Sequence, residues 1–125
     1  MRKIVAIVED DPASLAALSS LVASFGYETL GFLHPHALLE SGAARRADVL
    51  LADIRLPELN GIALHRRLMA SGIFLPTILV TAFPDEATRR MALEAGLFGY
   101  FAKPVVPEAL QHCLALATGG GGTSA

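Results

Sequence analysis

The sequence predicts an α/β protein in which five strands form a parallel sheet with helices on both faces. Apolar runs typical of buried strands alternate with stretches in which apolar residues recur at helical spacing. Strand–helix pairs of this kind form parallel sheets with right-handed crossovers, which place helices over both faces. The chain has 125 residues, of which 53% are hydrophobic and 18% charged. It is therefore long enough for one globular domain with a substantial core.

The first strand–helix pair lies at the start of the chain. Ile4–Val8 is an uninterrupted apolar run, as expected of a strand that is buried on both faces. Asp11 and Pro12 then supply a helix N-cap and a proline at the first helical position. Apolar residues follow at helical spacing, namely Leu15, Leu18, Val22 and Phe25. We expect this helix to stop at Gly26.

The second and third pairs differ in how polar their strands are. Tyr27–Phe32 mixes polar and apolar residues, which predicts an edge strand, and Pro35–Glu40 is a short helix. Val49–Asp53 is apolar up to its last residue and predicts a central strand, and Asn60–Ala70 is the helix that follows it. A Ser-Gly pair comes directly after each of these two helices and is expected to end it.

The last two pairs complete the predicted sheet. Pro76–Val80 is an apolar strand that ends at Thr81, and Asp85 is the N-cap of a helix that a glycine stops. Gly99–Ala102 is the fifth strand, and Pro107 opens the final helix. The apolar face of that helix consists of Leu110, Cys113, Leu114 and Ala117.

Composition limits the classes of partner and the location of the protein. The formal net charge is −2, so neither nucleic acid nor an anionic membrane is expected as the main partner. No apolar stretch approaches the roughly 20 residues needed to span a bilayer, and no secretion signal is evident. The single Cys113 excludes an internal disulfide and suits the reducing cytoplasm. We expect one domain over residues 1–118, followed by a flexible glycine-rich tail or linker start over residues 119–125.

Polar side chains lie at the ends of four predicted strands. Glu9-Asp10-Asp11 follows the first strand, Asp53 closes the third, Thr81 ends the fourth and Lys103 follows the fifth. In an open parallel sheet, ligands bind outside the carboxyl ends of the strands. These side chains are therefore expected to line one rim and to form a site.

The residue types on this rim suggest metal-assisted phosphate chemistry. Crowded carboxylates raise one another's pKa unless a cation compensates, and oxygen ligands with retained water suit Mg²⁺. The Lys103 ammonium and the Thr81 hydroxyl are groups that hold phosphoryl oxygens, and the carboxylate of Asp53 can act as a nucleophile. The rim thus indicates chemistry that passes through an aspartyl phosphate.

Four sequence blocks surround the residues of this rim, namely Ile7–Asp11, Asp53–Pro57 with Gly61, Val80–Ala82 and Lys103-Pro104. In this order they resemble the conserved blocks of response-regulator receiver domains of two-component signal transduction (the CheY-like superfamily). Four blocks in order are far more specific than any one alone, and the resemblance runs from about Lys3 to Ala117. It implies a flavodoxin-like, doubly wound fold with strand order 2-1-3-4-5 and a cis peptide before Pro104.

The resemblance also implies roles for the residues of the rim. Asp53 would accept a phosphoryl group from a sensor histidine kinase or a phosphotransfer protein. Mg²⁺ would be bound by Glu9, Asp10, Asp53 and the backbone carbonyl of Arg55. Thr81 would be the switch hydroxyl, Lys103 the phosphate-binding lysine and Tyr100 the switch aromatic. Glu9 replaces the commoner aspartate, so its longer side chain could reach the metal through water.

The resemblance further implies a signalling switch in the cytoplasm, with phosphoryl chemistry directed only at itself. The fourth helix, the fifth strand and the fifth helix would form the output face toward a downstream effector that the sequence does not identify. Direct binding of nucleic acid or membrane is not expected, and a homodimer on phosphorylation is left open. Arg55 and Phe83 occupy the two variable positions beside the site, and neither suits the orientation of an attacking water. Slow loss of the phosphoryl group is therefore predicted.

Three alternatives follow from the same residues. A Mg²⁺-dependent phosphohydrolase with an aspartyl nucleophile often uses a second aspartate two residues later, where this chain has Arg55. A flavodoxin-like cofactor binder needs a phosphate loop after the first strand, where Glu9-Asp10-Asp11 lies. The chain could also be a piece of a larger regulator, which the glycine-rich tail permits. The histidines, interpreted as surface residues, are His34, His36, His65 and His112.

Overall fold

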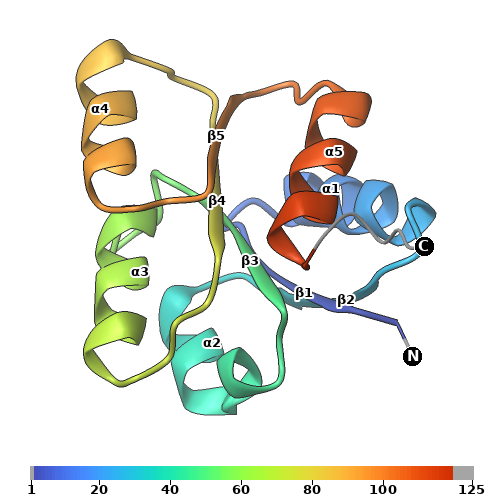
Figure 1. The fold of residues 1–125 in the computed structure, drawn as a ribbon, viewed down its shortest axis with the longest axis horizontal. Coiled ribbons are helices and arrows are strands. Elements are labelled where there is room, and N and C mark those ends of the chain that lie inside the picture. The colour runs from blue at the N-terminus through green and yellow to red at the C-terminus, as the bar shows by residue number, and fades with distance from the viewer. Residues whose placement is uncertain (1, 120–125) are drawn as a thin grey trace.

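A five-stranded parallel sheet forms the centre of the molecule (Figure 1). The computed structural model describes residues 2–119, so most of the predicted tail over residues 119–125 lies outside the described residues. The strands are β1 (Ile4–Val8), β2 (Glu28–Phe32), β3 (Val49–Asp53), β4 (Thr77–Thr81) and β5 (Gly99–Ala102). Their order is β2-β1-β3-β4-β5, which confirms the predicted fold class and topology.

Five α-helices alternate with the strands, as the sequence predicts. They are α1 (Pro12–Ser24), α2 (Pro35–Ser41), α3 (Gly61–Ala70), α4 (Glu86–Glu94) and α5 (Pro107–Ala117), with a short 3₁₀ helix at Ala43–Arg45. The fourth strand begins one residue later than predicted because Pro76 has no N–H to donate to the ladder, although its carbonyl still accepts from Leu50 N–H at 2.8 Å. Within residues 2–119, no helix has both the length and the apolar character required to cross a membrane.

Side-chain caps fix where three of the helices begin. Asp11 accepts a hydrogen bond from Ser14 N–H at 2.9 Å, as predicted for the start of α1. Asn60 and Asp85 cap α3 and α4 in the same way, at 2.8 Å and 2.7 Å. Each such cap contributes about 1 kcal/mol of helix stability. These caps set the helix starts beside the carboxyl ends of the strands.

Two apolar layers enclose the sheet. Helices α2, α3 and α4 cover one face, and α1 and α5 cover the other (Figure 1). Because side chains alternate along a strand, Ala6 and Val8 of β1 face the first layer whereas Val5 and Ile7 face the second. The central strands β3 and β4 are buried along their whole length. Two-sided burial accounts for their continuous apolar sequences.

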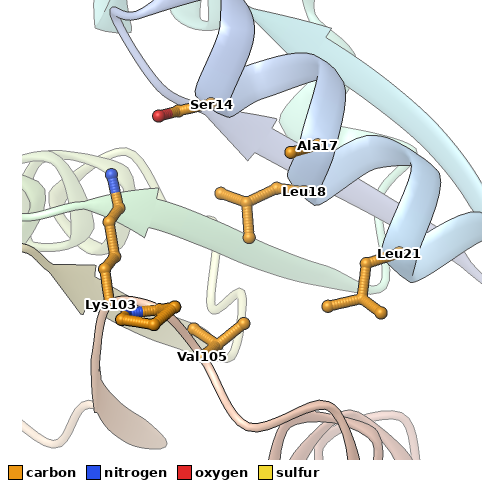
Figure 2. A pocket seen from close by; sticks show the side chains of 7 residues that line it. Ser14, Ala17, Leu18, Leu21, Lys103 and Val105 are labelled. Atoms are coloured by element: carbon orange, nitrogen blue, oxygen red, sulfur yellow. The ribbon is translucent and has the colours of Figure 1, made fainter.

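An apolar groove of about 410 Å³ lies between α1 and the segment that follows β5 (Figure 2). Leu18 and Leu21 line it from α1, and Val105 lines it from the opposite side. The side chain of Lys103 stands at one end of the groove. Helix α1 contains no charged residue, so its side of the groove offers packing and hydroxyl contacts rather than ion pairs.

The prediction that all four histidines lie at the surface is wrong for His65. His65 on α3 is only 6% exposed, and its Nδ1 lies 2.8 Å from Thr77 Oγ1. Thr77 donates its single hydroxyl proton to the Leu75 carbonyl at 3.0 Å, so His65 Nδ1–H must be the donor to Thr77. Burial, reinforced by the positive charge of Arg66, lowers the pKa of His65. A lone histidine within a helix carries no periodic signal that would reveal such a partner.

We predict that His65 makes the free energy of unfolding depend on pH. Its pKa in the folded state lies below the unfolded value of about 6.5, so its contribution is complete above about pH 6.5 and is lost as the pH falls toward the folded-state pKa. Urea denaturation between pH 8 and pH 5 measures this decline. The decline should shrink in His65→Gln and persist in His34→Gln, which changes an exposed histidine. An unchanged pH profile in His65→Gln would contradict the prediction.

Candidate functional site

The candidate site lies at the carboxyl edge of the sheet, where four strands end at the same level. Asp53 pairs with Val80 and Thr81 pairs with Ala102, so β3, β4 and β5 finish side by side. Glu9 follows β1 and is linked to β2 by a hydrogen bond from its N–H to the Phe32 carbonyl at 3.0 Å. The polar residues predicted to share a rim therefore do share one.

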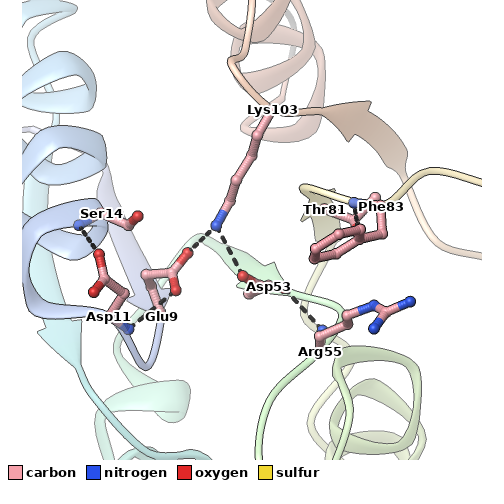
Figure 3. A network of polar contacts seen from close by, with 8 residues as sticks. All are labelled: Glu9, Asp11, Ser14, Asp53, Arg55, Thr81, Phe83 and Lys103. Atoms are coloured by element: carbon pink, nitrogen blue, oxygen red, sulfur yellow. Dashed lines mark hydrogen bonds and ion pairs between the residues drawn. The ribbon is translucent and has the colours of Figure 1, made fainter.

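Asp53 is held at the centre of this rim by two hydrogen bonds. It is 7% exposed. Its Oδ1 accepts from Arg55 N–H at 2.8 Å, and its Oδ2 accepts from Lys103 Nζ at 2.8 Å (Figure 3). One bond comes from the loop that follows β3 and the other from the segment that follows β5. Because both oxygens are engaged, the orientation of the carboxylate is fixed before any ligand binds.

Lys103 also contacts a second buried carboxylate. Its Nζ donates to Glu9 Oε1, while Glu9 Oε2 accepts from Asp11 N–H at 3.2 Å. Burial of Glu9, which is 1% exposed, raises the pKa of its carboxyl despite these two hydrogen bonds. Burial alone lowers the pKa of Lys103, but its bonds to Asp53 and Glu9 outweigh that effect and raise it. Lys103 is thus held in its charged form between the two carboxylates.

The carboxylates of Glu9, Asp10 and Asp53 form a cluster with the geometry of a cation site. One oxygen from each residue lies within 4.8 Å of the others. Asp10 is exposed, whereas Glu9 and Asp53 are buried. An all-oxygen donor set of this kind fits a small hard cation such as Mg²⁺, which keeps several water ligands. Arg55, whose backbone carbonyl was predicted as a fourth ligand, follows Asp53 by two residues on the same rim.

The two predicted switch residues lie in different surroundings. Thr81 is fully buried at the end of β4, and its hydroxyl oxygen accepts from Phe83 N–H at 3.0 Å. Tyr100 is half-buried on β5, and its hydroxyl accepts from Asp85 N–H at 3.3 Å. Tyr100 therefore contacts the N-cap residue of α4 rather than the carboxylates. No pattern in the sequence pointed to this contact.

A stacked pair borders the site on the side away from Lys103. The guanidinium of Arg55 lies 4.5 Å from the ring centroid of Phe83, which is a cation–π arrangement (Figure 3). Phe83 remains 62% exposed. The sequence predicted that both residues flank the site, but not that they stack. The Lys103-Pro104 peptide is cis, as the family resemblance implied.

Gly61 allows α3 to begin directly beside Asp53. A Cβ atom at this position would lie 2.6 Å from Leu79 Cδ2 and 3.0 Å from the Asp53 carbonyl oxygen. The Gly61 N–H donates to the Ile54 carbonyl at 3.2 Å, which ties the start of the helix to the end of β3. This close approach requires the absence of a side chain.

This geometry defines a class of protein: a doubly wound α/β domain with a lysine and an acidic cluster at the carboxyl edge of its sheet. Residues 5–115 match the model of the response regulator receiver domain, and the chain belongs to this family. Receiver domains are the signalling domains of response regulators in two-component systems. The family predicted from the four sequence blocks is thereby confirmed.

The chain is similar in sequence to parts of longer regulators. It is 35% identical over 107 residues to the response regulator protein TmoT of Ectopseudomonas mendocina, a match that covers 86% of this chain and 49% of TmoT. It is also 35% identical over 103 residues to the DNA-binding transcriptional regulator NtrC of Escherichia coli K12, covering 82% of this chain and 22% of NtrC. The chain thus spans about half the length of TmoT and about a fifth of NtrC.

Solved structures share its fold over nearly the whole chain. One is the receiver domain of a sensor histidine kinase from Pseudomonas aeruginosa PAO1, which has a magnesium ion coordinated in its active site cleft. It is 29% identical to this chain with a TM-score of 0.83, and the match covers 96% of this chain and 100% of that one. Another is a CheY-like receiver domain protein from Methanospirillum hungatei, 25% identical with a TM-score of 0.83 and 94% coverage of both chains.

We predict that Gly61→Ala destabilises the protein. The added methyl group would force Leu79, the Asp53 carbonyl or the start of α3 to move, and overpacking of this kind costs about 1–3 kcal/mol. Denaturant unfolding measures the change in the free energy of unfolding. Gly31→Ala is the matched control, because the three atoms nearest its new Cβ all belong to the flexible side chain of Leu15, the nearest at 3.2 Å. Equal losses in the two variants would contradict the argument.

Proposed function

We propose that this domain is a phosphorylation-dependent switch in which Asp53 accepts a phosphoryl group from a histidine kinase or a phosphotransfer protein. The observation that carries the proposal is the buried Asp53 carboxylate, oriented by Arg55 N–H and Lys103 Nζ beside an acidic cluster. Carboxylates act as nucleophiles in aspartyl-phosphate chemistry. Membership of the receiver-domain family supports this role.

In the transfer step, an Asp53 carboxylate oxygen attacks the phosphorus of a phosphohistidine. A new P–O bond forms, the P–N bond breaks, and the departing imidazole nitrogen takes a proton from solvent. The Lys103 ammonium lies against the attacking carboxylate, so it is placed to balance the charge of the incoming phosphoryl oxygens. Transfer therefore relies mainly on positioning and charge.

The domain would use Mg²⁺ as its cofactor. Glu9, Asp10, Asp53 and the backbone carbonyl of Arg55 are the proposed ligands, and the cluster of carboxylate oxygens within 4.8 Å supports the three side-chain ligands. When bound, Mg²⁺ neutralises negative charge shared by the carboxylates and the phosphoryl oxygens. The magnesium ion coordinated in the Pseudomonas aeruginosa receiver domain supports the same choice of metal.

Phosphorylation would be read out through the face formed by α4, β5 and α5. Thr81 is proposed to release Phe83 N–H and turn toward the phosphoryl group, while Tyr100 turns inward. Because the Tyr100 hydroxyl bonds to Asp85 N–H, its movement would free the backbone at the start of α4. A changed α4 would then alter the affinity for an effector.

The phosphodonor would reach Asp53 past the apolar groove beside α1. Lys103 lines this groove and also contacts Asp53, so a helix seated there would end next to the phosphorylation site. The location proposed for these events is the cytoplasm. The effector is proposed to be a further domain or a partner protein, since the regulators TmoT and NtrC extend well beyond the matched region.

We predict that Asp53 is the sole site of phosphorylation. The protein treated with acetyl phosphate and Mg²⁺ should gain the mass of one phosphoryl group, because the oriented carboxylate of Asp53 is the nucleophile. Intact mass spectrometry measures the increment, which should be absent in Asp53→Asn. Asp48→Asn is the matched control, because Asp48 accepts from Ile4 N–H at the opposite edge of the sheet. No increment in the wild type would count heavily against the proposed function.

We also predict that the phosphorylated form persists for minutes or longer. We infer that the stacked Arg55 and Phe83 side chains cover one side of the site, and neither is suited to orienting an attacking water. Phe83→Ala should shorten the lifetime several-fold by removing this cover, whereas Phe74→Ala, an exposed phenylalanine elsewhere, should not. Decay of the purified phosphoprotein, followed by mass spectrometry, measures both. Loss of the phosphoryl group from the wild type within seconds would refute the prediction.

A further inference from the structure

We propose that Glu9 is a positioning residue that holds the Lys103 ammonium against Asp53. In this assignment Glu9 acts through Lys103, and the exposed Asp10 supplies the cluster's main metal contact. The proposal rests on the function proposed above and gives Glu9 a role besides metal binding.

Both carboxylate oxygens of Glu9 already have protein partners. Oε1 accepts from Lys103 Nζ, and Oε2 accepts from Asp11 N–H at 3.2 Å (Figure 3). The residue is 1% exposed, so water does not compete for either oxygen. A carboxylate so enclosed is stabilised chiefly by its ammonium partner, because a buried charge needs a counter-charge. The geometry therefore couples Glu9 to Lys103.

Asp10 stands in contrast to Glu9. It is exposed, and within residues 2–119 no hydrogen bond or ion pair engages its carboxylate. Its oxygen nevertheless belongs to the cluster shared with Glu9 and Asp53. A cation that retains several waters is most easily accepted on this open side. The buried Glu9 is thus occupied by protein partners, whereas the exposed Asp10 is open to a cation.

The strand order explains why Lys103 needs an anchor. Lys103 follows β5, whereas Asp53 ends β3 and Glu9 follows β1. With strands about 4.8 Å apart, β3 lies about 10 Å from β5 and β1 about 14 Å. Lys103 must therefore extend across the end of β4, and its flexible four-carbon stem would otherwise sample many rotamers. Glu9, one methylene longer than aspartate, reaches toward it from the far side.

Lysine NMR offers a direct test, because the sequence contains only two lysines, Lys3 and Lys103. The metal-free protein should show a Lys103 ammonium signal protected from solvent exchange, identified by its loss in Lys103→Met. In Glu9→Gln this signal should shift or broaden beyond detection, while the Lys3 signal stays unchanged. Asp10→Asn, which removes the same charge one residue away, should preserve it. An unaltered Lys103 signal in Glu9→Gln would overturn the proposal.

Kinetics test whether this positioning matters for the reaction. At saturating Mg²⁺, Glu9→Gln should slow phosphorylation by acetyl phosphate about tenfold, the low end for partners that orient a functional group. In a Lys103→Met background, Glu9→Gln should have no further effect, because the ammonium through which Glu9 acts is absent. An equal loss in both backgrounds would overturn the proposal. Asp10→Asn should weaken Mg²⁺ binding more than Glu9→Gln does, and the reverse order would also overturn it.

If Glu9→Gln does not fold, as judged by circular dichroism, Glu9→Asp takes its place. This variant keeps the charge but shortens the side chain, and it should also disturb the Lys103 signal. The NMR and Mg²⁺ measurements need no phosphorylation. A wild type that takes up no phosphoryl group would therefore refute the proposed function, while an intact Lys103 signal in the Glu9 variants would refute the positioning role.

Discussion

The ammonium of Lys103, held between the buried carboxylates of Glu9 and Asp53, is the interaction on which the rest of the site depends. Two carboxylates this close inside a protein repel each other. One cation, from the segment that follows β5, offsets that repulsion and orients the Asp53 carboxylate. The parallel sheet makes the contact possible, because only a common carboxyl edge brings the ends of β1, β3 and β5 together.

The sequence predicted the parts of the molecule that depend on local pattern. Continuous apolar runs revealed β3 and β4 because both are buried along their whole length. Asp11 and Asp85 revealed helix starts because a cap joins residues only three positions apart. The rim was predictable because the ends of parallel strands coincide. The burial of His65 and the stacking of Arg55 on Phe83 were not, because each depends on side-chain conformations between separate elements.

Membership of the receiver-domain family and the local geometry answer different questions. The family match over residues 5–115 identifies the class of signalling domain. It does not distinguish the surroundings of Glu9 from those of Asp10, which come from burial and hydrogen bonding in this chain. Likewise, the family match does not reveal that Arg55 stacks on Phe83, which comes from the contacts of these two side chains in this chain.

The arrangement of the helices separates the two routes by which the site can communicate. Lys103 leads to the groove beside α1, on the face of the sheet that α1 and α5 cover. Tyr100 leads to the N-cap of α4, on the opposite face. The site lies between them at the strand ends, so a donor docked on one face would leave α4 on the other face accessible. The residues of the rim would then connect the groove beside α1 to α4, so a single phosphoryl group could change a surface away from the groove.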